Sequence, residues 1–123
     1  MPNYTGVFFV YLATYDNEKD IIKPVSLVFI GQATKVRDQI KYHIATDNPW
    51  HRFEKDGHEF CFSAAYLSGL DMERIVSAFV FQFKPPANIQ GADFFTYDPT
   101  TITARGKTAL LKSHFTVEKH PYE

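Results

Sequence analysis

The stretches GVFFVYL at positions 6–12 and VSLVFIG at positions 25–31 decide the fold of this chain. Both are rich in β-branched and aromatic residues, which favour buried strands. A glycine precedes the first stretch and another ends the second. The segment 15–24 between them is charged and ends in a proline, so we expect a connecting loop there. We therefore predict two strands, over 7–12 and 25–30, that pair antiparallel.

Helical spacing begins after the second strand. Val36, Ile40 and Ile44 fall four positions apart, which places them on one face of a helix over residues 33–44. A third strand is predicted over 60–67. The segment 71–84 carries a full apolar stripe and is followed by two prolines, so it predicts a second helix that ends there.

The predicted order β-β-α-β-α is that of a small α+β domain with a three-stranded, mainly antiparallel sheet flanked by helices. At 123 residues the chain has room for one domain. We expect residues 1–88 to form its core and residues 89–123 to form a C-terminal extension packed on the same domain. In that extension, 90–103 is turn-rich, 107–112 favours a short helix and 114–117 favours a strand.

Charge and composition narrow the function. Thirteen Lys and Arg against fourteen Asp and Glu give a net charge of −1, without the basic excess typical of nucleic-acid binders. Any such role must rest on a local patch. No apolar run is long enough to cross a bilayer, and the N-terminus lacks a signal-peptide pattern. With one cysteine and hence no internal disulfide, we expect a cytoplasmic protein without a membrane partner.

Short motifs at fixed spacings carry the functional prediction. They are, in order, Gly6-Val7-Phe8, Phe29-Ile30-Gly31, His43, and Pro85 with Asn88. Together they resemble the GIY-YIG nuclease domain, which is named after two such motifs on adjacent strands. The resemblance covers residues 6–88.

The same resemblance implies that the chemistry of this family is missing. Active members use two tyrosine hydroxyls, an arginine and a metal-binding glutamate. The equivalent positions here hold Phe8, Phe29, Gln39 and Val76, while His43 and Asn88 keep the family's residue. Loss of a general base or of a charged stabiliser typically costs about 10²–10⁴ in rate. Magnesium also prefers carboxylate oxygen, which valine cannot supply.

The resemblance thus implies a catalytically degenerate domain, leaning away from an enzyme, that acts as a nucleic-acid-binding or protein-interaction module without a cofactor. The alternative is an active metal-dependent endonuclease or phosphodiesterase with a rearranged site. There Glu73, one helical turn before Val76, would hold Mg²⁺ and His43 would act as base. That reading requires Glu73 and His43 to converge on one cleft. Otherwise Glu73 is a solvated acid in the first turn of its helix.

Five basic residues are candidate contacts to nucleic acid: Lys35, Arg37, Lys41, Arg52 and Lys55. Tyr42 and Trp50 lie among them, and aromatic rings interleaved with cations can stack on bases. The alternative is an ordinary solvated helix face. Apart from Glu73, we predict no metal ligand, since the histidines fit no common zinc spacing. Surplus aromatic residues would also suit a protein interface or self-association.

Overall fold

A central antiparallel sheet organises the molecule. In this computed structural model it consists of β1 (Gly6–Asp16), β2 (Ile21–Ala33) and β3 (Glu59–Tyr66), in the order β2-β1-β3. The predicted α+β class and the three predicted strands are confirmed. The structure describes residues 4–45, 48–88, 92–104, 110–112 and 114–121.

The hairpin between β1 and β2 is longer than expected. The loop predicted over 15–24 is wrong, because the two strands stay paired as far as Asp16 and Ile21. The carboxylate of Asp16 accepts hydrogen bonds from the backbone N–H groups of Glu18 and Lys19, at 3.0 and 3.2 Å, and Asp20 adopts a positive φ of 53°. These local contacts close a tight turn within a few residues, so the charged segment needs no long loop.

Pro24 does not interrupt β2. It pairs with Ala13 beside a shift in the register of the hairpin. Because β2 is an edge strand of the three-stranded sheet, a missing N–H on its outer side removes no ladder hydrogen bond.

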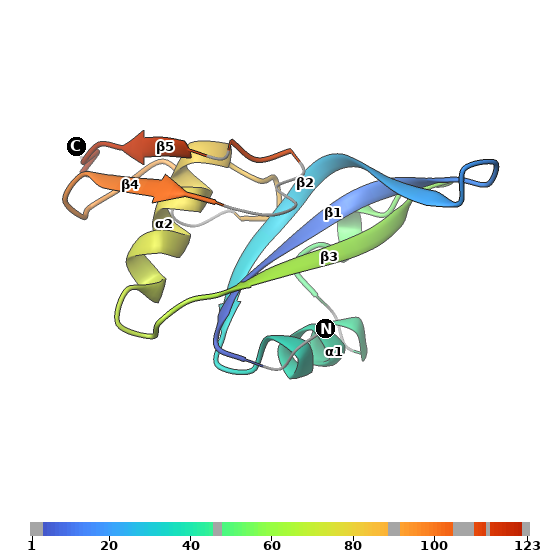
Figure 1. Ribbon diagram of the computed structural model, residues 1–123, viewed down its shortest axis with the longest axis horizontal. Coiled ribbons are helices and arrows are strands. Elements are labelled where there is room, and N and C mark those ends of the chain that lie inside the picture. The colour runs from blue at the N-terminus through green and yellow to red at the C-terminus, as the bar shows by residue number, and fades with distance from the viewer. Residues whose placement is uncertain (1–3, 46–47, 89–91, 105–109, 113, 122–123) are drawn as a thin grey trace.

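Both faces of β1 are buried. Alternation sends Phe8 and Val10 to one face and Val7, Phe9 and Tyr11 to the other, and all five side chains are at most 4% exposed. Figure 1 shows α1 on one side of the sheet and α2 with β4 and β5 on the other. Two hydrophobic layers therefore meet on this single strand.

The first layer contains α1 (Val36–Ala45) and a 3₁₀ turn, η1 (His51–Phe53). Val36 and Ile40 are buried against the sheet as predicted, whereas Ile44 is 61% exposed. Trp50, only 1% exposed, joins the buried cluster of this layer in place of Ile44.

The second layer contains α2 (Met72–Phe83), β4 (Thr100–Thr103) and β5 (His114–Val117). α2 and β5 confirm the predicted second helix and the predicted strand over 114–117. β4 was not expected in the turn-rich segment, and it forms because it pairs antiparallel with β5. Of the helix predicted over 107–112, residues 107–109 lie outside the described residues and 110–112 are not helical.

The described part of the extension packs on the same core as α2. Ile102, Phe115 and Val117 belong to the buried cluster that includes Phe79, and the Phe115 ring lies 5.5 Å from the Phe79 ring. Within the described residues, neither helix is long and apolar enough to pass through a bilayer.

Asn88 ties the segment that follows α2 to the outer edge of β2. Its Oδ1 accepts a hydrogen bond from the Ile30 N–H, and its Nδ2 donates one to the Ile30 carbonyl, each at 2.8 Å. The Ala87 N–H donates to the Val28 carbonyl at 3.0 Å. One side chain thus satisfies two backbone groups that an edge strand would otherwise leave unpaired.

We predict that Asn88→Ala lowers the free energy of unfolding by about 2–3 kcal/mol, because two hydrogen bonds are lost and both Ile30 groups remain partly buried. Asn88→Asp should destabilise as well, since it sets a carboxylate oxygen against the Ile30 carbonyl. Urea denaturation measures both changes. The control is Gln32→Ala, an exposed position on the same strand, with a change within about 0.5 kcal/mol. An Asn88→Ala change as small as this control would contradict the prediction.

Candidate functional site

Four rings pack together on the α1 side of the sheet. We call Phe8, Phe29, His43 and Trp50 the aromatic cluster. The centroid of the Phe8 ring lies 6.0 Å from Phe29 and 6.4 Å from both His43 and Trp50. Trp50 lies 5.4 Å from Phe29 and 5.2 Å from His43. Phe8 and Trp50 are at most 2% exposed, so the cluster is close-packed around them.

Gly31 makes room for this packing. It pairs with Phe8 across the hairpin. A Cβ atom at Gly31 would lie 2.4 Å from Cζ of Phe8 and 2.8 Å from Cε2 of Phe29, well inside van der Waals contact. The glycine is therefore required by the two neighbouring rings.

Gln39 and His43 interact on α1. Nε2 of Gln39 lies 2.9 Å from Nε2 of His43. Because an amide nitrogen only donates, His43 accepts through Nε2 and carries its proton on Nδ1. That Nδ1 atom is buried and has no hydrogen-bond partner among the described residues. Burial lowers the pKa of His43 below its ordinary value of 6.5, which favours a neutral ring at pH 7.

The remaining family-equivalent residues lie in the other layer. Val76 of α2 packs against the cluster that includes Phe79, on the opposite face of the sheet from Phe8. A pocket of about 420 Å³ along β2 is lined by Phe29 of the aromatic cluster and by Glu73 and Val76 of α2. Asn88 lines the same pocket. Both polar atoms of the Asn88 side chain are already bonded to Ile30.

Glu73 and His43 lie in different layers. Glu73 is exposed on the first turn of α2, and His43 packs against Phe8 and Trp50 beneath the other face. His43 does not line the pocket that Glu73 lines. Among the described residues, no three His, Cys, Asp or Glu side chains gather as a metal-ligand set.

The predicted nucleic-acid contacts spread along the molecule. All five are exposed: Lys35, Arg37, Lys41, Arg52 and Lys55. α1 begins beside the start of β1, where the Val36 N–H donates to the Tyr4 carbonyl at 2.9 Å. Lys55 instead shares a pocket with Leu12 and three acidic residues. Gly6 and Leu12 are about 20 Å apart along the strand, so Lys55 lies far from the start of α1. Nucleic-acid binding through these residues stays a prediction.

Trp50 was expected among the basic residues as a ring that can stack on bases, but it is only 1% exposed and belongs to the core instead. The backbone N–H of Trp50 donates to Oδ1 of Asn48 at 3.1 Å, and Nδ2 of Asn48 donates to the backbone carbonyl of His43 at 3.0 Å. This bridge brings the only tryptophan back onto the sheet from a polar loop. A lone Trp beside a proline in a polar segment is the one signal that could have suggested a buried anchor.

Comparisons with protein-family models, with curated proteins and with solved structures found no match to this chain. The GIY-YIG resemblance therefore stays a prediction that rests on the motifs and their spacing.

We predict that Gly31→Ala destabilises the fold by about 1–3 kcal/mol, because its methyl group collides with the rings of Phe8 and Phe29. In a Phe8→Leu background the same substitution should cost less, by at least about 0.5 kcal/mol, which a double-mutant cycle measures. The matched control is Gly69→Ala, where an added Cβ meets nothing within 4 Å. Equal costs of Gly31→Ala in both backgrounds would contradict this account.

The lowered pKa of His43 predicts a pH-dependent stability. The unfolded chain takes up this proton near pH 6.5, and the folded chain takes it up only at a lower pH. The contribution of neutral His43 to the free energy of unfolding is therefore complete above pH 6.5 and is lost as the pH falls toward the pKa of the folded state. The loss of unfolding free energy between about pH 7.5 and about pH 5 should be smaller in His43→Gln than in the parent protein. His51→Gln, at an exposed position, is the control. NMR titration of the His43 ring with a midpoint at or above 6.5 would contradict it.

Proposed function

We propose that this chain is a GIY-YIG-like domain that binds a protein partner and does not hydrolyse nucleic acid. The observation that carries the proposal is the aromatic cluster. The positions that would present two hydroxyl groups hold Phe8 and Phe29, whose rings pack against Trp50. These positions serve the core of the domain.

The protonation of His43 also supports a non-hydrolytic role. A general base needs a lone pair within reach of a water molecule. In His43 the lone pair is on Nε2, which already accepts a hydrogen bond from Gln39, and the protonated Nδ1 is buried. Abstracting a proton would require breaking the contact to Gln39.

The position of Glu73 weighs against the alternative, a rearranged nuclease. A metal-assisted mechanism needs the ion and the base on opposite sides of one reacting phosphate. His43 belongs to α1 and Glu73 to α2, and these helices lie on opposite sides of the sheet (Figure 1). The exposed Glu73 carboxylate fits its place in the first turn of α2, where the helix dipole favours an acid.

Surface features favour a protein over a nucleic acid as the partner. The net charge is −1, and Lys55 lies far from Lys35 at the start of α1. By contrast, Tyr66, the last residue of β3, is 69% exposed, and Leu70, between β3 and α2, is 97% exposed. Exposed large apolar side chains are typical of protein-interaction sites. The free thiol of Cys61 fits our further proposal of a cytoplasmic location.

We predict that the purified protein, incubated with Mg²⁺ or Mn²⁺ and single- or double-stranded DNA or RNA, produces no cleavage above the buffer background on denaturing gels. The reason is that Phe8, Phe29 and Gln39 carry neither a hydroxyl nor a charge, and Nε2 of His43 is already bonded to Gln39.

The variants Glu73→Gln and His43→Gln are assayed in parallel to exclude a contaminating nuclease. Cleavage by the parent protein that either substitution abolishes would refute the non-hydrolytic function and support the rearranged site.

A further inference from the structure

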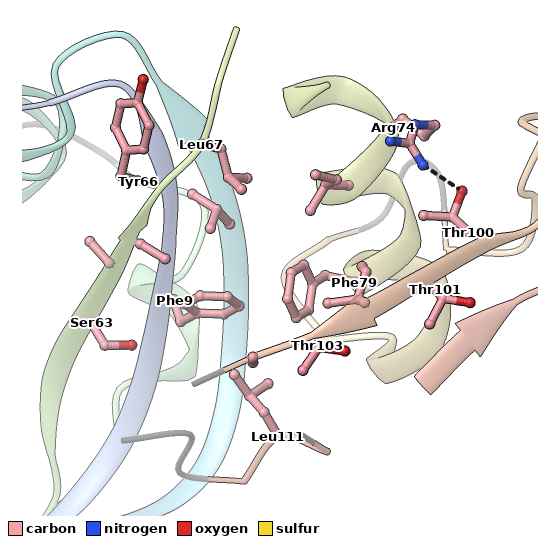
Figure 2. Close-up of a pocket in the computed structure, with 16 residues that line it drawn as sticks. Phe9, Ser63, Tyr66, Leu67, Arg74, Phe79, Thr100, Thr101, Thr103 and Leu111 are labelled. Atoms are coloured by element: carbon pink, nitrogen blue, oxygen red, sulfur yellow. Dashed lines mark hydrogen bonds between the residues drawn. The ribbon is translucent and has the colours of Figure 1, made fainter. Parts of the chain in front are cut away.

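A groove separates β3 from β4. It has a volume of about 410 Å³, and we call it the edge groove. One wall is the segment 63–67 and the other is the segment 100–104. Phe9 of β1 and Phe79 of α2 form the floor, with ring centroids 5.2 Å apart, and Figure 2 shows the two rings pointing toward each other.

Both walls of the edge groove are backbone edges. Side chains of a strand alternate between its two faces, so a pocket lying on one face meets every second residue. Here five consecutive residues on each wall line the groove. Within the part of the chain that the structure describes, β3 pairs only with β1, and β4 pairs only with β5. The groove therefore runs along unpaired strand edges.

The hydrogen-bonding groups on the open edge of β3 follow from its pairing with β1. The Leu67 N–H donates to the Thr5 carbonyl at 3.2 Å, and the Ala65 carbonyl faces Gly6. In an antiparallel pair these inward-facing residues alternate with outward-facing ones. The N–H and C=O groups of Ala64 and Tyr66 consequently point away from β1, toward the open side.

Nothing in the sequence of β3 protects this edge. Exposed edges are usually guarded by lysine, proline, a bulge or a covering segment. The sequence of β3 is EFCFSAAY, in which the only charge is at the first residue and there is no proline. Its register with β1 is continuous from Glu59 to Tyr66. Such an edge is suited to accept another strand.

One end of the edge groove carries a cation. Arg74 donates from Nη1 to Oγ1 of Thr100 at 3.1 Å and from Nη2 to a carboxylate oxygen of Asp71 at 3.2 Å, and Figure 2 shows it at the end next to Thr100. The guanidinium retains further N–H donors. Among the described residues that line the groove, Arg74 is the only cation and there is no acid.

From these observations we infer that the edge groove binds an extended peptide as an additional strand on β3. Backbone groups of the peptide pair with Ala64 and Tyr66, and every second side chain is apolar and rests on Phe9 and Phe79. A carboxylate of the peptide, either its chain end or an acidic side chain, binds Arg74. This inference rests on the proposed protein-binding function and names the class of its partner.

The test selects peptides from a library of random hexapeptides fused to the carboxyl end of a carrier protein. A second library places the same hexapeptides internally, which separates a terminal carboxylate from an acidic side chain. We expect enriched sequences with apolar residues at alternate positions. Fluorescence anisotropy of the selected peptides should show affinity weakened about tenfold or more by Arg74→Gln, because a charge-assisted contact is lost.

Ala64→Pro tests the strand pairing, because it removes one outward N–H and leaves the pairing with β1 intact. It should weaken binding about tenfold, whereas Ala64→Ser, which keeps the N–H, and Arg52→Gln, outside the groove, should bind as the parent does. Circular dichroism checks that each variant is folded. If Ala64→Pro does not fold, selected peptides methylated at alternate backbone nitrogens replace it, and one of the two methylation registers should abolish binding.

If neither library yields a binder, the inference is overturned, as it is by binders that tolerate both Arg74→Gln and the loss of the backbone donor. Light scattering that shows dimers of the parent but monomers of Ala64→Pro would assign the edge to a second copy and would also overturn it. Peptide binding together with nucleic-acid cleavage would refute the proposed function alone. Absence of both would refute this inference alone.

Discussion

The burial of β1 on both faces is the constraint on which the rest of the structure depends. Five consecutive side chains, from Val7 to Tyr11, are nearly inaccessible to solvent. A strand of this kind needs a partner strand on each side and a hydrophobic layer on each face. The two helices, the small sheet and Trp50 supply those layers. A candidate site can therefore lie only on surfaces that these layers and the strands β2 and β3 do not bury.

Much of the fold could be predicted because it is encoded locally. The apolar run that begins at Gly6 and the stripe of α2 each identify their element without reference to the rest of the chain. The parts that were missed depend on distant or very short-range contacts. Thr100–Thr103 becomes a strand only through pairing with β5, and the long hairpin depends on the carboxylate of Asp16 closing its turn.

The candidate site was predictable in composition but not in arrangement. The sequence alone identifies Phe8, Phe29 and Gln39 as positions without hydroxyl or charge. It cannot indicate that Trp50 leaves its loop to pack on Phe8, because the bridge through Asn48 depends on where α1 ends. Nor does the sequence show that Val76 and Phe8 lie on opposite faces of the sheet, because the path of the connecting segments decides which face a helix covers.

The two outer edges of the three-stranded sheet differ in what lies against them. On β2, Asn88 and Ala87 bond to Ile30 and Val28, so the segment that follows α2 covers part of that edge. Among the described residues, no strand pairs with the outer edge of β3, and the edge groove runs along it. The side chain of Asn88 and the N–H of Ala87 satisfy three backbone groups of β2, whereas the outward groups of Ala64 and Tyr66 on β3 face the edge groove. At these groups a peptide can form backbone hydrogen bonds, and its carboxylate can bind the neighbouring Arg74.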